Sequence, residues 1–206
     1  MNYIKEQVSD TVNALRLEFI KYDQYKGIVY LDRDGVLIED HGYVGSAKKV
    51  DLINGSISFL QQCKKKDYII AIITNQSGIG RGYYSWKDYY LVTNEMLKKF
   101  GDEIRPHFIV ACSKNPEDDA GCTDMYRKPQ IGMIQYIREQ IGLEISNELL
   151  IGDKASDLKC GLNADIKSIS HVLTGHGVTE KGKVDDLRKF YPEISVYRDI
   201  GKIKIL

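Results

Sequence analysis

The sequence lacks three features that would place it in a specialised class of proteins. Its 29 basic residues are balanced by 29 acidic residues, so no net charge favours binding to nucleic acid or to a membrane surface. No apolar run approaches the roughly 20 residues that a membrane span requires. The first residues form no apolar secretory segment, and the four cysteines are scattered along the chain. We therefore expect a cytoplasmic protein with reduced thiols and with neither nucleic acid nor a membrane as a partner.

What the 206 residues do contain is an alternation of short apolar segments and segments with helical spacing. The apolar segments are rich in β-branched residues, as is typical of strands that are buried on both faces. These segments are residues 28–31, 69–73, 108–111, 149–151 and 169–173. The segments with helical spacing are residues 55–66, 86–100, 130–141 and 155–164. The alternation predicts a doubly wound α/β domain, with a parallel sheet and helices on both faces.

The two ends of the chain lie outside this alternation. Five apolar side chains near the N-terminus have the spacing of one helix face, and these are Val8, Val12, Leu15, Phe19 and Tyr22. We therefore predict that residues 1–25 form a helical extension of the main domain, which comprises residues 26–206. The extension either packs on that domain or contacts a second copy of the chain. The C-terminal tail predicts a short helix at 183–190 and a strand at 194–197.

Two carboxylates lie two positions apart at the end of the first apolar segment. Residues i and i+2 of an extended segment point to the same side, so Asp32 and Asp34 should share one side while Arg33 faces away. Such carboxylates repel each other unless a cation or a shared proton lies between them, which suits Mg²⁺. The pair also suits chemistry with one carboxylate as nucleophile and the other as proton donor. Gly35 allows the sharp turn that follows, although surface turns contain the same pattern.

Three further segments carry polar residues at or beyond the ends of apolar segments. Thr74 begins a run of amide, hydroxyl and glycine residues, which can donate hydrogen bonds to phosphate oxygens. Arg127 and Lys128 precede a proline at the start of a predicted helix, and a lysine can neutralise a transferring phosphoryl group. Asp153 and Asp157 suit a metal ligand and its supporting carboxylate. Taken singly, the three also fit a polar turn, solvated surface cations and acids at a helix N-terminus.

Ligands of an open α/β sheet bind beyond the carboxyl ends of its strands, so Asp32, Thr74 and Asp153 should converge on one rim. In their order along the chain, the four segments resemble the four motifs of the haloacid dehalogenase (HAD) superfamily of aspartyl-phosphate hydrolases. The resemblance implies that Asp32 is the nucleophile and that Asp34 protonates the leaving group and then activates water. It also implies that Thr74 and Lys128 hold the phosphoryl oxygens. The implied Mg²⁺ ligands are Asp32, the main-chain carbonyl of Asp34 and Asp153, with Asp157 in support.

Four stretches of the sequence carry a closer resemblance: residues 40–44, residues 74–82, residues 127–129 with Gly132 and Met133, and residues 152–154. From about residue 28 to about residue 175, the chain resembles the family of D-glycero-D-manno-heptose 1,7-bisphosphate 7-phosphatases. The resemblance implies removal of the 7-phosphate from a small phosphorylated sugar during synthesis of lipopolysaccharide or capsule precursors. The implied substrate contacts are Asp40, His41, Gly42, Tyr43, Asn75, Gln76, Ser77, Arg127 and Lys154. The gaps between motifs are too short for a large cap domain, so loops 36–50 and 112–126 would set specificity. The sequence is compatible with both a monomer and a homodimer.

One departure from this family concerns its structural zinc loop, which is spaced Cys-x-His and Cys-x-Cys. Cys112 matches that pattern, but Lys114 replaces the histidine. Asp124 and Tyr126 stand where cysteines are expected, and Cys122 lies two places away. Because a closed zinc site needs four nitrogen or sulfur ligands, we expect no structural zinc. The alternatives are a histidinol-phosphate phosphatase, another small sugar phosphatase or, more remotely, a non-enzymatic phospho-acceptor domain.

Overall fold

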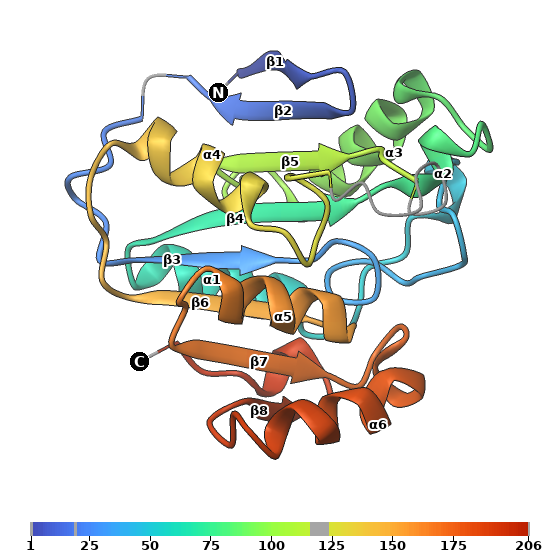
Figure 1. Cartoon of the computed structure of the whole chain (residues 1–206). Coiled ribbons are helices and arrows are strands. Elements are labelled where there is room, and N and C mark those ends of the chain that lie inside the picture. The colour runs from blue at the N-terminus through green and yellow to red at the C-terminus, as the bar shows by residue number, and fades with distance from the viewer. Residues whose placement is uncertain (1, 19, 116–123, 206) are drawn as a thin grey trace.

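This computed structural model of the chain describes residues 2–18, 20–115 and 124–205. They form an eight-stranded sheet that is covered by helices (Figure 1). The strands are β1 (Tyr3–Ser9), β2 (Val12–Leu17), β3 (Gly27–Leu31), β4 (Tyr68–Asn75), β5 (Phe108–Cys112), β6 (Glu148–Gly152), β7 (Ser168–Val172) and β8 (Ser195–Tyr197). The helices are α1 (Ser56–Lys65), α2 (Ser77–Gly80), α3 (Trp86–Phe100), α4 (Gly132–Ile141), α5 (Ala155–Asn163) and α6 (Gly177–Arg188), with short 3₁₀ helices η1 (Ala47–Lys49) and η2 (Ile200–Lys202).

The order of the strands along the sheet is β1–β2–β5–β4–β3–β6–β7–β8. All pairs from β5 across to β8 are parallel, whereas β1 and β2 are antiparallel to their neighbours. The central strand β3 separates β4 and β5 on one side from β6 and β7 on the other, which confirms the predicted doubly wound α/β fold. As predicted, the described elements between β3 and β5 include no large cap domain; they are η1, α1, β4, α2 and α3.

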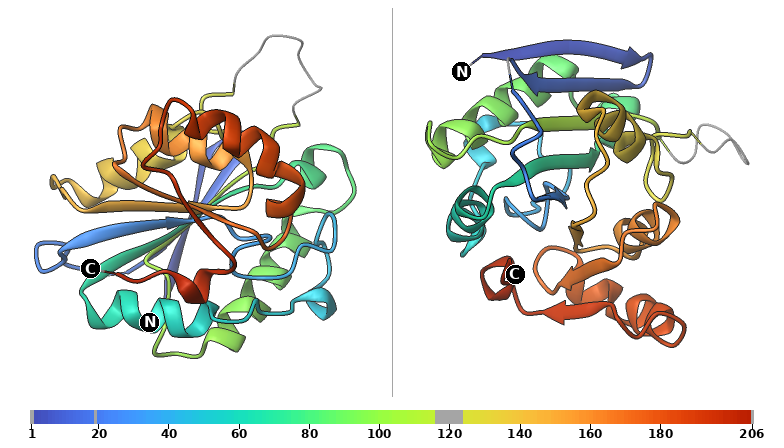
Figure 2. Two further views of the ribbon diagram at one scale, coloured as in Figure 1. Left: turned by 90° about the horizontal axis from the view of Figure 1, so that it is seen from below. Right: turned by 90° about the vertical axis from the view of Figure 1, so that its left-hand side faces the viewer.

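Different helices cover the two faces of the sheet. Figure 2 shows α4, α5 and α6 over one face and α1 and α3 over the other. Along β3, Ile28 and Tyr30 pack into one apolar core, whereas Val29 and Leu31 pack into the opposite core. The whole of β3 is buried, as expected for a parallel strand covered on both faces. No helix in the described part of the chain is long and apolar enough to span a membrane.

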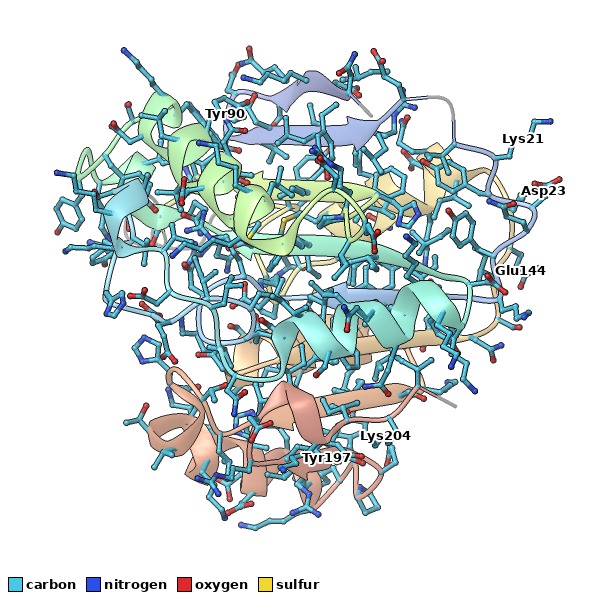
Figure 3. The ribbon with its side chains drawn as sticks, turned by 180° about the vertical axis from the view of Figure 1, so that it is seen from behind. Lys21, Asp23, Tyr90, Glu144, Tyr197 and Lys204 are labelled. Carbon is cyan, nitrogen blue, oxygen red and sulfur yellow. The ribbon has the colours of Figure 1, made fainter. Side chains whose placement is uncertain are left out.

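The N-terminal residues form a β-hairpin, so the predicted helical extension at 1–25 was wrong. β2 continues the main sheet by pairing with β5, from Val12 opposite Cys112 to Arg16 opposite Phe108. On the face seen in Figure 3, the ammonium of Lys5 in β1 lies 3.8 Å from the ring centre of Tyr90 in α3. The hairpin is therefore joined to the main sheet on its edge and to α3 on one face.

The misleading pattern at the N-terminus has a physical origin. β2 is buried on both faces, because Ala14 packs into one core and its neighbour Leu15 packs into the other. Such a strand shows no alternation of apolar and polar residues, and its side chains can match a helical stripe by coincidence. Tyr22 stacks on Phe108 with ring centres 5.7 Å apart, and Phe19 lies outside the described residues.

Two other predicted helix starts differ from the structure. Arg127 and Lys128 do not open a helix, because α4 begins at Gly132 and they lie in the preceding turn. The last helix, α6, begins at Gly177 rather than at residue 183. Its described sequence has only a weak apolar stripe, with Gly177 and Val184 buried, so spacing alone placed its start poorly.

Candidate active site

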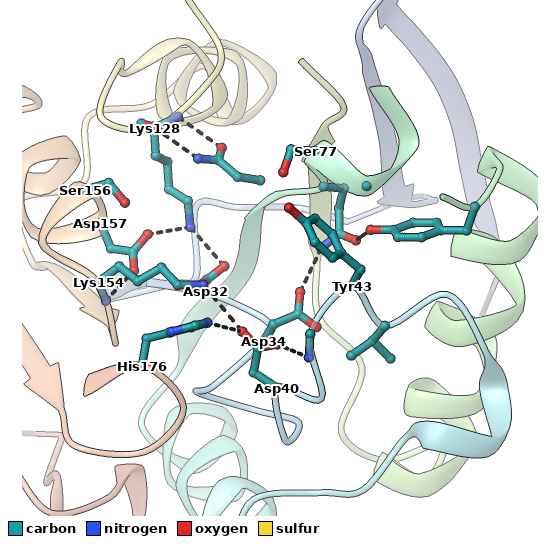
Figure 4. A pocket seen from close by; sticks show the side chains of 16 residues that line it. Asp32, Asp34, Asp40, Tyr43, Ser77, Lys128, Lys154, Ser156, Asp157 and His176 are labelled. Carbon is teal, nitrogen blue, oxygen red and sulfur yellow. Dashed lines mark hydrogen bonds and ion pairs between the residues drawn. The ribbon is translucent and has the colours of Figure 1, made fainter. Parts of the chain in front are cut away.

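The carboxyl ends of β3, β4 and β6 meet at one edge of the sheet and bring polar residues together. Asp32 follows β3, Thr74 and Asn75 end β4, and Asp153 follows β6. A cavity of about 300 Å³ opens at this edge (Figure 4). Its lining residues are Asp32, Asp34, Asp40, Gly42, Tyr43, Val44, Asn75, Gln76, Ser77, Gly78, Tyr84, Lys128, Lys154, Ser156, Asp157 and His176.

Four buried charged residues form what we call the floor cluster: Asp32, Lys128, Asp153 and Asp157. Asp32, Lys128 and Asp157 line the cavity, and the carboxylate of Asp153 lies next to those of Asp32 and Asp157. Lys128 Nζ lies 2.9 Å from Asp32 Oδ1 and 2.8 Å from Asp157 Oδ1, and it donates to the Ile73 carbonyl at 2.9 Å. An ammonium has three donors, and these three acceptors match them. Burial lowers the pKa of Lys128, but the carboxylates of Asp157 and Asp32 outweigh burial and raise it. The ammonium therefore stays charged within the protein.

Asp157 supports the floor cluster with both of its carboxylate oxygens. Its Oδ1 lies beside Lys128, and its Oδ2 accepts a hydrogen bond of 3.0 Å from the Lys154 amide at the start of α5. Burial raises the pKa of Asp157, although the charge of Lys128 opposes this shift. Because both oxygens have partners, Asp157 fits the supporting position that the sequence suggested.

Asp32 and Asp153 form the part of the floor cluster that suits a divalent cation. Carboxylate oxygens of Asp32, Asp153 and Asp157 lie within 4.8 Å of one another, and no other group of three potential ligands occurs among the described residues. Asp153 Oδ2 accepts a 2.7 Å hydrogen bond from the His176 amide, but the buried Oδ1 has no donor among those residues. Burial, together with the charges of Asp32 and Asp157, raises the pKa of Asp153 to about 8. A hard cation such as Mg²⁺ would stabilise these oxygens.

Two glycines allow the loops to approach Asp153 closely. Gly35 has a φ of +83°, and a Cβ there would lie 2.3 Å from Asp153 Oδ2. Gly175 has a φ of +56°, and a Cβ there would lie 2.5 Å from the same oxygen. Both positions combine a left-handed backbone with no room for a side chain. Thr174 Oγ1 also donates to the Gly35 carbonyl at 2.6 Å, which ties the two loops together over the carboxylate.

Asp34 lies at the same edge but in a separate hydrogen-bond network. Gln76 Nε2 donates to Asp34 Oδ2 at 2.7 Å and to Thr74 Oγ1 at 2.8 Å. Gln76 Oε1 in turn accepts from Tyr84 Oη at 2.6 Å and from Arg33 Nη2 at 2.9 Å. Arg33 is fully buried, and its Nη2 lies 3.0 Å from Asp34 Oδ1. The prediction that Arg33 faces away was therefore wrong, because its long side chain folds back onto the neighbouring carboxylate.

Four residues at the opening form what we call the mouth cluster: Asp40, Tyr43, Lys154 and His176. Asp40 Oδ2 lies 3.1 Å from His176 Nε2 and 3.5 Å from Lys154 Nζ, while its Oδ1 accepts from the Gly42 amide at 2.8 Å. Burial alone would raise the pKa of Asp40, but the Gly42 amide and the charges of Lys154 and His176 lower it. The side chain of His176 is 51% exposed and Tyr43 is 50% exposed, so this cluster is open to solvent.

The structure leaves four of the sequence-predicted residues out of the cavity lining, and the predicted metal ligand Asp153 is one of them. His41 was predicted to contact substrate, but its Nε2 pairs with Asp51 Oδ2 at 3.3 Å, outside the cavity. Arg127 Nη1 donates to the Lys114 carbonyl at 2.8 Å beside the cavity. Thr74 is buried beneath the lining, where its oxygen accepts from Gln76. The remaining predicted substrate contacts, Asp40, Gly42, Tyr43, Asn75, Gln76, Ser77 and Lys154, do line the cavity.

The positions of the family's zinc loop are only partly described. Cys112 is buried at the end of β5, and Cys122 lies outside the described residues. Asp124 Oδ2 accepts a 2.7 Å hydrogen bond from Thr11 Oγ1, and its Oδ1 accepts one of 2.8 Å from the Tyr126 amide. Asp124 is thus engaged within the protein, and the expectation of no structural zinc stays a prediction.

Known proteins share both this sequence and this fold. Residues 27–177 match the family model of polynucleotide kinase 3 phosphatase. The D-glycero-beta-D-manno-heptose-1,7-bisphosphate 7-phosphatase of Pasteurella multocida is 37% identical over 161 residues, which cover 77% of this chain and 88% of the relative. The D-glycero-alpha-D-manno-heptose-1,7-bisphosphate 7-phosphatase of Campylobacter jejuni is 35% identical, covering 79% of this chain and 88% of the relative. The chain belongs to the HAD-like phosphatases.

A solved structure of this fold agrees with that membership. The D,D-heptose 1.7-bisphosphate phosphatase from B. bronchiseptica, complexed with magnesium and phosphate, superimposes with a TM-score of 0.72 at 24% identity, over 85% of this chain and 94% of that one. Family membership confirms the prediction that the chain is a phosphatase. The roles of individual HAD motif residues in this chain stay predictions, and the proposal below assigns them.

Three residues of the HAD-like site were missed from the sequence. Arg33 and Tyr84 join the network around Asp34, and His176 lies in the mouth cluster. His176 follows β7 by a few residues, so the rule that ligands bind beyond strand ends could have found it. No spacing rule indicates Arg33 or Tyr84, because their contacts depend on how long side chains bend inside a packed loop.

Proposed function

We propose that this HAD-like phosphatase removes the 7-phosphate of D-glycero-D-manno-heptose 1,7-bisphosphate through an aspartyl-phosphate on Asp32, with Mg²⁺ as cofactor. The observation that carries the proposal is the floor cluster. In it, Asp32 lies 2.9 Å from the Lys128 ammonium, and its carboxylate lies close to that of Asp153. Relatives at 33–37% identity are named as phosphatases of this sugar, which supports the choice of substrate.

The first step transfers the phosphoryl group to the protein. A carboxylate oxygen of Asp32 attacks phosphorus, the bond from phosphorus to the sugar oxygen breaks, and protonated Asp34 donates its proton to that oxygen. Two side chains hold the Asp34 carboxyl in place: Gln76 donates to one of its oxygens and Arg33 to the other. Lys128 keeps its positive charge next to Asp32 and stabilises the negative charge that the phosphoryl oxygens carry. The Thr74 oxygen accepts a hydrogen bond from Gln76, and that bond leaves the hydroxyl hydrogen of Thr74 available to donate to a phosphoryl oxygen.

The second step releases the phosphate and restores the protein. Asp34, now ionised, takes a proton from a water molecule while the water oxygen attacks phosphorus. The bond between phosphorus and Asp32 breaks, and the carboxylate is regenerated together with inorganic phosphate. When bound by Asp32, the Asp34 carbonyl and Asp153, Mg²⁺ would supply positive charge that offsets repulsion between the carboxylates and the phosphoryl oxygens.

The mouth cluster supports a substrate that carries a second anionic group. Burial lowers the pKa of Lys154, but the nearby carboxylates of Asp32, Asp153 and Asp40 outweigh burial and raise it. Its ammonium and the imidazole of His176 flank Asp40 at the opening of the cavity, where the far end of a small sugar would lie. Lysine binds phosphate as a compact charge, so Lys154 is the first candidate for that contact.

The proposal is tested by phosphate release from a panel of esters with and without Mg²⁺. The panel contains the alpha and beta anomers of heptose 1,7-bisphosphate, fructose 1,6-bisphosphate, histidinol phosphate and an aryl phosphate. We expect the highest kcat/KM for a heptose bisphosphate, with a 1-phosphate as the product identified by phosphorus NMR. Preference for histidinol phosphate would contradict the proposed substrate but not the proposed chemistry. Turnover without Mg²⁺ would contradict the proposed role of Mg²⁺ as cofactor.

A further inference from the structure

The turn of the N-terminal hairpin reaches the same rim as the cavity. β2 runs antiparallel to β5, so the β1–β2 turn lies beside the carboxyl end of β5 (Figure 1). Val12 pairs with Cys112, which places Thr11 of the turn next to Ser113. The hairpin lies outside the segment 27–177 that matches the family model.

Thr11 holds two residues of the neighbouring loop with different atoms. Its carbonyl oxygen accepts from the Ser113 amide at 2.8 Å and from Ser113 Oγ at 3.0 Å. Its hydroxyl donates to Asp124 Oδ2 at 2.7 Å. A hydrogen bond to a carboxylate is among the stronger ones in proteins, so the contact with Asp124 is a fixed point for that segment.

Two of the hydrogen bonds that Arg127 makes lead to Asp124 and to the neighbour of Ser113. Its main-chain amide donates to the Asp124 carbonyl at 3.1 Å. Its Nη1 donates to the carbonyl of Lys114, the residue after Ser113, at 2.8 Å. The backbone of Arg127 therefore depends on Asp124, which the Thr11 hydroxyl holds. Its guanidinium depends on Lys114, whose neighbour Ser113 is held by the Thr11 carbonyl.

Lys128, the next residue, has a separate set of anchors. Its amide and carbonyl pair with the side chain of Asn75 at 3.1 Å each, and its ammonium is fixed within the floor cluster. Loss of the Thr11 contact should consequently move Arg127 more than Lys128. This separation predicts an effect on substrate binding without an equal effect on the chemical step.

We propose that Thr11 is a positioning residue that holds Arg127 next to the cavity, where its guanidinium can join Lys154 in binding the distal anionic group of the substrate. The proposal rests on the proposed function, because that function supplies a second phosphate for Arg127 to bind. Arg127 suits this contact because the guanidinium fork binds phosphate oxygens in bidentate fashion.

The test compares Thr11→Val, which removes the hydroxyl at nearly constant shape, with Thr11→Ser, which keeps it. The loss of one hydrogen bond to a carboxylate should raise KM for the sugar bisphosphate about tenfold in Thr11→Val, with kcat changed by less than about twofold. Thr11→Ser should restore the wild-type KM, and KM for an aryl phosphate should be unchanged in both variants. Equal KM values for Thr11→Val and the wild type would overturn the proposal.

A control separates positioning from general support of the sheet edge. Val12 is fully buried in β2 and has no hydroxyl to donate to Asp124, so Val12→Ala should lower the melting temperature without changing KM. If Val12→Ala raises KM as much as Thr11→Val, the effect comes from the sheet edge and the proposal fails.

Hydrogen exchange gives a readout that does not depend on the substrate. The Tyr126 and Arg127 amides donate to Asp124 and should exchange several-fold faster in Thr11→Val, but not in Thr11→Ser or Val12→Ala. Unchanged exchange at these two amides would overturn the anchoring role even if KM changes. If the wild type hydrolyses no bisphosphate, the proposed function fails on its own, and exchange alone decides whether Thr11 anchors this segment.

Discussion

The floor cluster and the mouth cluster are parts of one cavity with opposite electrostatic character. In the floor cluster three carboxylates face a single ammonium, and Lys128 and Asp153 are at most 2% exposed. In the mouth cluster a single carboxylate, Asp40, is flanked by Lys154 and His176 near the solvent. The floor therefore has an excess of negative charge that a divalent cation can balance, whereas the mouth offers the Lys154 ammonium and the His176 imidazole to an anion.

The same contrast separates chemistry from selectivity. Interactions of buried charges are weakly screened, so the geometry of the floor is fixed and a lost partner is costly. Interactions of exposed charges are screened by solvent and contribute little energy each. We infer that changes in the floor affect every substrate, whereas changes in the mouth affect only substrates that reach it.

The largest expected effect comes from Asp32→Asn. The amide cannot act as the nucleophile, so turnover should fall by about 10³-fold or more on every ester in the panel. The fold should persist, because the amide keeps the shape of the side chain; a cooperative melting transition checks this. Turnover retained within tenfold of the wild type would contradict the assignment of Asp32 as the nucleophile.

The next effect concerns stability and compares one lysine from each cluster. Lys128→Met leaves Asp32 and Asp157 buried without their cation and should destabilise the protein by about 3–5 kcal/mol in urea unfolding with EDTA at pH 7. Lys154→Met should cost less than Lys128→Met, because its side chain is 35% exposed and solvent screens its interactions with Asp40, Asp32 and Asp153. Equal losses in the two variants would remove the distinction between floor and mouth.

The floor was predictable from the sequence because strands buried on both faces leave clear apolar segments. Asp32 and Asp153 directly follow β3 and β6, so their convergence follows from the topology of a parallel sheet. Helix α3 was also predictable, because Ser85 and Asp88 form a capping box before a regular apolar stripe. These features depend on local patterns that a single sequence displays.

The mouth and the hairpin were less predictable because their contacts are not set by periodicity. His41 and Tyr43 are neighbours in one loop, yet only Tyr43 lines the cavity. Side-chain direction in an irregular loop depends on its backbone angles, and Tyr43 has a φ of +50° that no pattern indicates. In β2, burial on both faces removed the alternation that identifies a strand at the edge of a domain.

The pH dependence of stability should also distinguish the two clusters. The pKa of Asp153 is raised to about 8, so protonation favours the folded state. This contribution is fully present below the unfolded pKa of about 4 and is lost as the pH rises toward 8. The pKa of Asp40 is lowered, so Asp40 stays ionised throughout this range. With EDTA, the melting temperature should therefore fall from pH 5 to pH 8.

Mg²⁺ should reverse this loss, because it binds the ionised carboxylates of the floor cluster and only in the folded state. The increase in melting temperature caused by Mg²⁺ should grow from pH 5 to pH 8. Asp153→Asn should show neither the pH slope nor the Mg²⁺ response, while Asp40→Asn should keep both. A Mg²⁺ response in Asp153→Asn equal to that of the wild type would place the cation elsewhere.

The smallest effect is expected at the exposed end of the mouth cluster. His176→Ala removes an imidazole that is 51% exposed and should raise KM for the sugar bisphosphate about threefold, since exposed polar contacts contribute under about 1 kcal/mol. Its kcat and the hydrolysis of an aryl phosphate should be unchanged. Val178→Ala, an exposed position two residues further along, is the matched control and should leave KM unchanged. The His176 amide also donates to Asp153, so an equal loss on the aryl phosphate would show that this residue acts on the floor through its backbone.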